Sequence, residues 1–311
     1  MRRPKLVLSG VWTASALLLV SVSACAKSPP EAHSASTTAK DGTVVPSAMA
    51  APVAGAEDNT PPPGIDISKL DEFQKKVFYR VVNKEPSICG QAHSLLQSAK
   101  KDSSCRRSMN AVRYVARLVE QGYTDSEVGE ALTKRYRSSV PKAIDVAEAP
   151  VKGNVAAKVS LVEFADYECP HCKRLQSVLK QVMDEFRGEV KLYFKHYPLP
   201  QHTNARLAAE AAVAAQKQGK FWQFEEKLWA NQENLTPSEL EKFAKEVGLD
   251  VAKFRQDMEA PATKARVQKD RVDGGTLGLS STPTLYINGR EYTDPRDADS
   301  LREWIKEDLQ K

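Results

Sequence analysis

The feature that most constrains this chain is a pair of cysteines, Cys169 and Cys172, at the junction of two different hydrophobic patterns. Residues 160–164 are rich in apolar and β-branched residues, which favours a buried strand, whereas apolar residues recur at helical spacing over 173–186. A strand that runs directly into a helix places Cys169 at the helix start. Pro170 suits the first helical turn, because the N–H that it lacks has no partner there. The sequence therefore predicts a Cys-Pro-His-Cys motif at a helix N-terminus.

The start of a helix gives the first cysteine its chemistry. Unpaired backbone N–H groups and the positive end of the helix dipole stabilise a thiolate, and the thiolate is the form that attacks disulfides. Cys172 lies one turn further along and can close a disulfide with Cys169. Half of a zinc site and an inert bridge are the other two interpretations. Zinc would need two further ligands, and the sequence has no second Cys-x-x-Cys or His-x-x-x-His pair, so we expect no metal and no other cofactor.

This motif resembles that of the DsbA-like branch of the thioredoxin superfamily, and three further stretches resemble signatures of that family in the same order. The stretches are Phe194–Leu199, Gly219–Trp222 and Ser281–Thr284. The resemblance covers roughly residues 155–309. It implies an α/β chain with a thioredoxin-like fold and an inserted helical subdomain.

The resemblance also implies roles for individual residues. Pro283 would follow a cis peptide bond and face the two cysteines, and Thr282 would offer backbone groups to an extended substrate. Glu163 would be a buried carboxylate beneath the second cysteine and would exchange a proton with Cys172. The alternatives are an ordinary trans proline at the start of a strand and an exposed strand glutamate.

These residues predict a protein thiol–disulfide oxidoreductase that acts as a dithiol oxidase. A substrate thiolate would attack the disulfide at Cys169, which we expect to be the exposed sulfur, and form a mixed disulfide. His171, as a cation or an N–H donor, would stabilise the Cys169 thiolate and make the enzyme a stronger oxidant, unless it is an exposed loop histidine. A disulfide isomerase or a reductase of cytochrome c maturation would use the same residues from the dithiol form. A noncatalytic tethered peptide-binding or metal-binding module would use the same groove without turnover.

The N-terminus has the features of a secreted bacterial lipoprotein. Basic residues precede an apolar run, and Val22–Cys25 resembles a lipobox. We predict a signal peptide over residues 1–24 and lipidation of Cys25, so that acyl chains hold the protein at the extracytoplasmic face of the cell envelope. An uncleaved membrane anchor is the alternative. Residues 25–64 are rich in Ala, Pro, Ser and Thr and are predicted to be a disordered tether.

A small all-α module is predicted over residues 65–140. Ser68 can cap its first helix, and Thr124–Glu127 is a capping box for its last. A core this thin would gain from a disulfide between Cys89 and Cys105, which contributes roughly 3 kcal/mol for a loop of about this length. A second redox pair is the alternative, although the spacing is not Cys-x-x-Cys. The five cysteines then divide into one lipid site, one structural pair and one redox pair.

A linker is predicted over residues 140–154 and the catalytic domain over residues 150–311, so the two predictions overlap at the start of the domain. Residues 203–278 intervene between its second and third strands, and their helical patterns predict the inserted subdomain. The last two strands are predicted at 284–287 and 291–293, on either side of an Asn-Gly hairpin turn.

Charge and composition limit the partners. The formal net charge is +5, but the predicted signal peptide carries three uncompensated positive charges, and the remainder does not imply nucleic-acid binding. With 41% apolar residues the chain can bury a sizeable core. The expected partners are reduced or unfolded secreted polypeptides, a membrane thiol oxidase or other redox partner, and the membrane through the lipid anchor.

Overall fold

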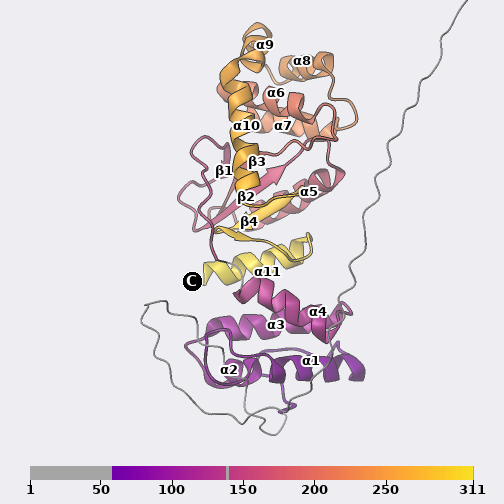
Figure 1. The fold of residues 1–311 in the computed structure, drawn as a ribbon, viewed down its shortest axis with the longest axis vertical. Coiled ribbons are helices and arrows are strands. Elements are labelled where there is room, and N and C mark those ends of the chain that lie inside the picture. The colour runs from indigo at the N-terminus through magenta and orange to yellow at the C-terminus, as the bar shows by residue number, and fades with distance from the viewer. Residues whose placement is uncertain (1–57, 138–139, 311) are drawn as a thin grey trace, which may run out of the picture. The chain divides into compact units, whose positions relative to one another are not determined.

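The computed structural model of the chain describes residues 58–137 and 140–310 (Figure 1). The predicted signal peptide, the predicted lipidation site Cys25 and most of the predicted tether lie outside the described residues. Among the helices of the described ranges, none is long and apolar enough to cross a membrane.

The end of the predicted tether, residues 58–64, is described, and there the prediction of disorder is wrong. The Asp58 carboxylate lies 2.7 Å from the Lys100 ammonium, and the Asn83 side chain donates to the Asp58 carbonyl. Pro62 is buried. The module therefore begins before residue 65, because its own helices provide partners for this segment.

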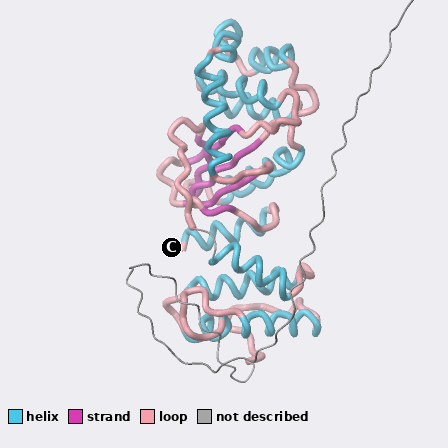
Figure 2. Tube along the Cα trace, in the orientation of Figure 1, coloured by secondary structure: helices cyan, strands magenta, loops and turns pink. Residues whose placement is uncertain are grey.

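The first part of the described chain is all-α (Figure 2). Its first helix begins after Asp71 rather than at Ser68, because the Asp71 carboxylate accepts from the Gln74 backbone N–H and the Gln74 side chain accepts from the Asp71 N–H. Thr124 and Glu127 form the predicted capping box. The helices are α1 (Glu72–Lys84), α2 (Leu95–Lys101), α3 (Arg106–Glu120) and α4 (Asp125–Leu132), followed by a π-helical turn, η1 (Thr133–Arg137).

The module is held together by an apolar core and one disulfide. Phe78, Leu95 and Val115 are completely buried in that core. Cys89 and Cys105 are joined, with their Cα atoms 6.1 Å apart, so the predicted disulfide-linked helical module is confirmed. The bridge ties the connection between α1 and α2 to the start of α3.

The second part contains a five-stranded mixed sheet in the order β1-β3-β2-β4-β5. Strands β2 and β3 are parallel, whereas β4 pairs antiparallel with β2 and β5 antiparallel with β4. Strand β1 lies near the end of the segment predicted to be a linker and pairs antiparallel with β3. The linker prediction is therefore wrong for residues 151–153. The strands are β1 (Val151–Gly153), β2 (Val159–Ala165), β3 (Val190–His196), β4 (Thr284–Ile287) and β5 (Arg290–Glu291).

Helices pack on both faces of the sheet. On one face, α5 (Pro170–Glu185) and α11 (Ala298–Leu309) bury Leu175 and Trp304 against Leu161 of β2. On the other face, Val162 and Phe164 belong to a second apolar cluster. Successive residues of a strand point to opposite faces, so the alternation along β2 feeds both clusters. With its parallel β2-α5-β3 unit and its antiparallel β4-β5 hairpin, the second part has the predicted thioredoxin-like fold.

The insertion between β3 and β4 consists of five helices (Figure 1). Its centre is α6, in which Ala208, Ala211 and Ala212 are completely buried, because small side chains allow the other helices to approach closely. The helices are α6 (Ala205–Lys217), α7 (Phe221–Ala230), α8 (Pro237–Glu246), α9 (Val251–Glu259) and α10 (Pro261–Thr276).

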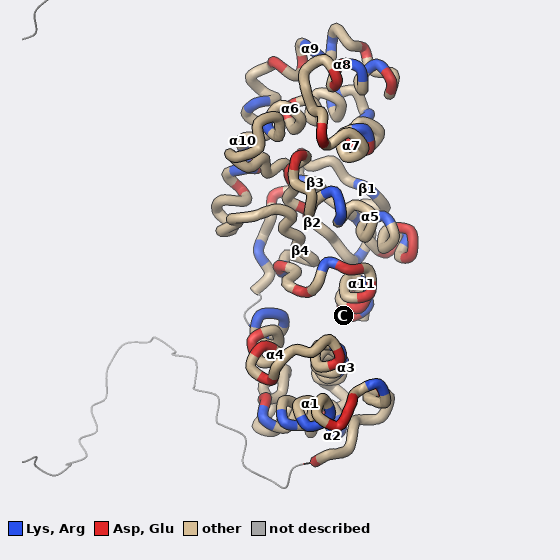
Figure 3. The backbone as a smooth tube through the Cα atoms, turned by 90° about the vertical axis from the view of Figure 1, so that its right-hand side faces the viewer, with Lys and Arg blue, Asp and Glu red and all other residues tan. Residues whose placement is uncertain are grey.

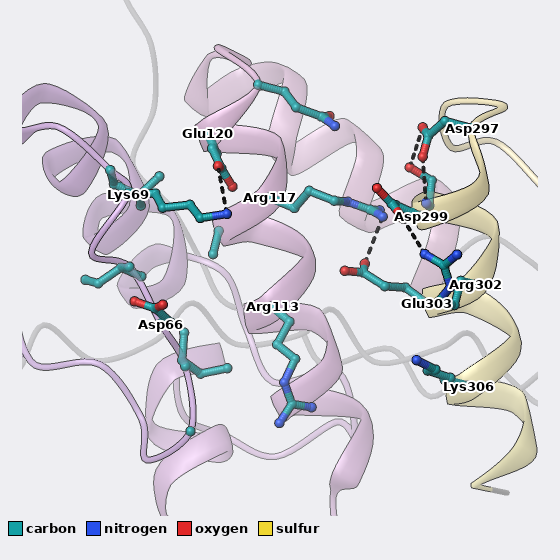
Figure 4. Close-up of a pocket in the computed structure, with 17 residues that line it drawn as sticks. Asp66, Lys69, Arg113, Arg117, Glu120, Asp297, Asp299, Arg302, Glu303 and Lys306 are labelled. Atoms are coloured by element: carbon teal, nitrogen blue, oxygen red, sulfur yellow. Dashed lines mark hydrogen bonds and ion pairs between the residues drawn. The ribbon is translucent and has the colours of Figure 1, made fainter.

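Buried charges link the all-α module to the loop and helix that end the chain. Arg117 and Arg135 both contact the Asp294 carboxylate, and Arg135, only 2% exposed, also lies 2.9 Å from Glu307 of α11. Buried ions need such partners, because removing a charge from water is costly. Figure 4 shows Arg117 directed toward Glu303 beside a cleft of about 940 Å³ that α3 and α11 line. The two cysteines of the predicted redox pair are not among the lining residues of that cleft.

Acidic and basic residues are interspersed along both parts of the described chain (Figure 3). Many of the ion pairs are local and exposed, as between Lys253 and Asp257 on α9. Exposed pairs of this kind contribute little to stability, so we expect the apolar cores to carry most of it.

Candidate active site

Cys169 and Cys172 lie where the loop after β2 runs into α5. Figure 1 shows β2 and α5. Cys169 is the N-cap residue of α5, and Pro170 occupies the first turn. Both cysteines are free thiols in this structure. Cys169 is only 5% exposed and Cys172 is completely buried, so the expectation of an exposed Cys169 sulfur is wrong. The reason is the insertion, because both cysteines share an apolar cluster with its helices α6, α7 and α8.

The surroundings of Cys169 favour its thiolate. A hydrogen bond from the Cys172 thiol lowers the pKa of Cys169 to about 5; Thr282 and the backbone N–H groups of Cys172 and His171 act in the same direction, against the effect of burial. These N–H groups belong to the first turn of α5, at the positive end of the helix dipole, and that of Cys172 also donates to the Cys169 carbonyl at 3.1 Å. As a thiol, Cys169 instead donates to the Thr282 carbonyl, at a sulfur to oxygen distance of 3.4 Å. The first sulfur is therefore suited to be both nucleophile and leaving group.

Cys172 has the opposite electrostatics. Burial raises the pKa of the Cys172 thiol far above its ordinary value, and the hydrogen bond to Cys169 and the charge of Glu163 raise it further. Two sulfurs one helical turn apart thus prefer different protonation states at neutral pH. Reduction of the disulfide must therefore bring a proton to the Cys172 sulfur and leave the Cys169 sulfur ionised.

Glu163 lies in β2 and is completely buried, which excludes the alternative of an exposed strand glutamate. Burial raises the pKa of Glu163 to about 8; the hydrogen bond from Gln176 opposes this rise, and the charge of Glu225 adds to it. The Gln176 amide nitrogen lies 2.9 Å from Glu163 Oε1. A carboxyl with such a pKa can gain and lose a proton near neutral pH.

His171 does not use its ring as predicted. The imidazole is exposed, and its Nδ1 lies 2.6 Å from an Arg174 guanidinium nitrogen, so it accepts a hydrogen bond there. An arginine always donates, which makes this ring nitrogen an acceptor. His171 contributes to the Cys169 thiolate through its backbone N–H instead. The His171 ring is therefore exposed in this structure, as the alternative interpretation expected.

The loop before β4 brings Pro283 to the cysteines. The peptide bond between Thr282 and Pro283 is cis, as the resemblance implies, and the Thr282 carbonyl contacts Cys169. The Arg296 side chain donates to the Pro283 carbonyl at 3.0 Å. The loop is thus held from the segment between β5 and α11, and its Thr282 backbone lies beside the reactive sulfur.

Sequence reasoning missed Gln232, which connects the insertion to the active-site loop. It lies in the turn after α7, is 8% exposed, and its amide nitrogen donates to the carbonyls of Tyr167 and Cys169, at 2.7 and 2.9 Å. A glutamine in a loop has no recognisable pattern, and its partners lie more than sixty residues earlier in the chain. No signal in the sequence could have identified it.

Asp166 was also missed, although its sequence position offered a signal. The buried carboxylate accepts from the Glu168 backbone N–H at 2.7 Å, from the Leu199 N–H at 2.7 Å and from His202 Nδ1 at 2.8 Å. An aspartate directly after a strand commonly forms such a turn with its own backbone. Asp166 therefore fixes the loop that presents Cys169.

Comparison with known proteins agrees with this geometry. A family model described as Thioredoxin matches residues 145–307, more than half of the chain. The chain belongs to the thioredoxin family. Oxidised BdbD from Bacillus subtilis is similar to it, with a TM-score of 0.52 and 29% identity, over 56% of this chain and 99% of that one. A thioredoxin-like oxidoreductase from Silicibacter pomeroyi is 28% identical over 53% of this chain and 94% of that one, with a TM-score of 0.49. The findings thus show a DsbA-like thiol–disulfide oxidoreductase of the thioredoxin superfamily.

Similarity to curated proteins falls on the thioredoxin domain alone. The Na(+)/H(+) antiporter NhaA 1 of Mycolicibacterium gilvum is 35% identical over 163 residues, which is 51% of this chain and 26% of the antiporter. NhaA 1 of Mycobacterium sp. strain KMS matches over the same length with the same identity. The chain thus spans about a quarter of the length of these relatives. Ion transport is named for those proteins and is not carried over to this chain.

Proposed function

We propose that this protein is an extracytoplasmic dithiol oxidase that introduces disulfides into secreted or envelope polypeptides. The observation that carries the proposal is the position of Cys169, which caps α5 and lies against the Thr282 carbonyl. There its pKa is lowered to about 5, beside a Cys172 thiol whose pKa is raised. Whatever stabilises the thiolate stabilises the reduced enzyme, and each 1.4 kcal/mol of that stabilisation raises the potential of a two-electron couple by about 30 mV. The site therefore favours accepting electrons from substrates.

The reaction proceeds by two exchanges. A substrate thiolate attacks Cys169 of the Cys169–Cys172 disulfide, the bond between the two enzyme sulfurs breaks, and its electron pair goes to Cys172, which takes up a proton. A second substrate thiolate then attacks the substrate sulfur of the mixed disulfide and releases Cys169 as a thiolate. Substrate thiols are oxidised to a disulfide, and the enzyme disulfide is reduced to one thiol and one thiolate.

Three neighbours support these steps. Glu163 supplies the proton that Cys172 takes up, since it is buried and its pKa lies near neutral pH. The backbone of Thr282 binds an extended substrate next to Cys169, and Pro283 sets the course of that loop.

A membrane thiol oxidase or other redox partner is required to restore the disulfide after each turnover.

The redox equilibrium of Cys169 and Cys172 with glutathione tests the direction of the reaction. We expect a potential more oxidising than the value of about −270 mV that is typical of thioredoxin. Ultraviolet absorbance of the thiolate should titrate near pH 5, and reduced peptides should be oxidised with turnover. If the Cys169 thiol instead titrates near the ordinary pKa of about 8.5 and the potential is as reducing as that of thioredoxin, the oxidase assignment fails and a reductase assignment replaces it.

The proposed location rests on the N-terminal sequence. The basic start, the apolar run and the Val-Ser-Ala-Cys sequence occur in the order of a lipoprotein signal, so we propose removal of residues 1–24 and lipidation of Cys25. Mass spectrometry of the native N-terminus decides this. An intact Met1, or an unmodified N-terminus elsewhere, would contradict lipid anchoring but leave the redox site unaffected.

A further inference from the structure

Helix α7 of the insertion brings a second carboxyl, that of Glu225, to the buried side of the active site. Glu225 is 4% exposed, and its Oε1 atom has no hydrogen-bond partner among the described residues. The same holds for Oε2 of Glu163. A buried polar atom without a partner is costly, and more so when the group is ionised. Both carboxyls are therefore placed where holding a proton is favourable.

A small cavity lies beside Glu225 and approaches Glu163 through Gln176; Glu163 itself is not among the residues that line it. The cavity has a volume of about 70 Å³, and its lining includes Gln176 and Glu225. Gln176 is the shared element, because its amide also donates to Glu163 Oε1 at 2.9 Å. Exposed residues of α5, Lys180 and Asp184, line the cavity as well, so it reaches the surface. A space of this size has room for water, and water carries protons between such groups.

The electrostatics of the two carboxyls are matched. Burial raises the pKa of Glu225 to about 7, while Trp229 and the Lys152 ammonium act to lower it. The pKa of Glu163 is raised to about 8, mainly by burial. Groups with similar pKa values near the working pH exchange protons at little cost. The titratable or charged groups around them are Lys152 of β1, Tyr167, Cys172, Lys180 and Asp184 of α5, and Glu226 of α7.

We propose that Glu225 is a second proton carrier, which relays protons between solvent and Glu163 through this cavity. When the enzyme disulfide is reduced, the Cys172 thiolate takes the proton of Glu163. The Glu163 carboxylate takes a proton from Glu225 through water in the cavity, and Glu225 regains one from solvent. Reoxidation runs the transfers in reverse. The inference rests on the proposed function only in that Cys172 must change its protonation state, so it holds for an oxidase and a reductase alike.

Stopped-flow reduction of the oxidised full-length protein by dithiothreitol, followed by tryptophan fluorescence across pH 5 to 9, tests the relay. Glu225→Gln should slow reduction roughly tenfold at pH 7, at the lower end of general acid catalysis. It should also move the pH–rate profile to lower pH, because the charge of Glu225 no longer raises the pKa of Glu163. The exposed neighbour on the same helix provides the matched control, and Glu226→Gln should leave both rate and profile unchanged.

Further variants separate a relay from a packing role. Glu163→Gln combined with Glu225→Gln should be no slower than Glu163→Gln alone, since both groups serve one path. Glu225→Asp should restore part of the rate. If Glu225→Gln fails to fold, Gln176→Leu interrupts the same path from α5 and should slow reduction in the same pH range. Wild-type rates and profiles in the folded variants, or additive losses in the double variant, would overturn the relay. A reducing wild-type potential would overturn only the oxidase assignment.

Discussion

The two cysteine pairs of this protein share one feature and differ in the rest. In each pair, one cysteine is the N-cap residue of a helix: Cys105 at α3 and Cys169 at α5. Cys105 is bridged to Cys89, sixteen residues earlier, whereas Cys169 and Cys172 are free thiols one turn apart. A helix start alone therefore does not make a redox site.

The surroundings explain the difference. Near Cys105 lie hydroxyls: its sulfur is 3.0 Å from the Ser108 hydroxyl, which in turn bonds to Ser98. Near Cys169 lie the Thr282 carbonyl and a partner thiol whose proton balance is tied to the buried Glu163. Two cysteines on one helical turn are close enough to form and break a disulfide. When that disulfide is reduced, the Cys172 sulfur needs a proton source. We therefore expect the first pair to contribute to stability and the second to carry the chemistry.

The largest expected effect is loss of turnover in Cys172→Ala. No resolving thiol then remains within the enzyme, so mixed disulfides between Cys169 and substrates should accumulate and oxidation of reduced peptides should cease. Nonreducing gels after incubation with a polypeptide that carries a disulfide measure the trapped complexes, because the single Cys169 thiolate forms a mixed disulfide only by attacking a disulfide. The double variant Cys89→Ala with Cys105→Ala, which leaves no unpaired thiol, is the matched control and should trap none. Equal trapping by both variants would remove the distinction between the pairs.

The second effect concerns stability. Replacing Cys89 and Cys105 together by Ala should lower the free energy of unfolding by about 3 kcal/mol in urea titrations, through the loss of the loop constraint. The potential of Cys169 and Cys172 should stay unchanged. In the wild type, mild reductant should open the active-site pair alone, which differential alkylation shows. Reduction of both pairs at one potential would instead indicate a relay between them.

A third effect is the pH dependence of the reduced form. The pKa of Cys169 is about 5 in the folded protein, below the value of about 8.5 expected after unfolding. Its contribution to the stability of the reduced protein is therefore complete above pH 8.5 and is lost as the pH falls toward 5. Urea midpoints of reduced and oxidised protein should converge over this range. The oxidised protein is the control, since Glu163 and Glu225 titrate in both forms. A constant gap would contradict the lowered pKa.

The smallest effect is expected at His171. Its ring accepts from Arg174, and its backbone N–H, which supports the Cys169 thiolate, remains in His171→Ala. The substitution should lower the potential and raise the Cys169 pKa, by no more than about 30 mV in the potential. Arg174→Ala, which frees the ring, is the matched comparison. A large drop in His171→Ala would show that the imidazole itself acts on the sulfur.

The sequence by itself determined the elements and the motif. The apolar and β-branched stretch before Cys169 and the helical spacing after it located β2 and α5, and the capping box at Thr124 located α4. Such signals are local, because each depends on residues within one or two turns or along one strand. The Cys-Pro-His-Cys resemblance then implied the thioredoxin-like fold, the inserted helices and the position of Pro283 next to the cysteines.

Only the tertiary structure decided which groups meet. Gln232 reaches the carbonyl of Cys169, Glu225 comes beside Glu163, and Arg135 joins Asp294 and Glu307, although each partner lies far away in the chain. The insertion also buries Cys169, which the motif alone predicts to be exposed. Burial and electrostatics depend on what packs around a residue. The pKa values that separate the two sulfurs are therefore a property of the folded chain.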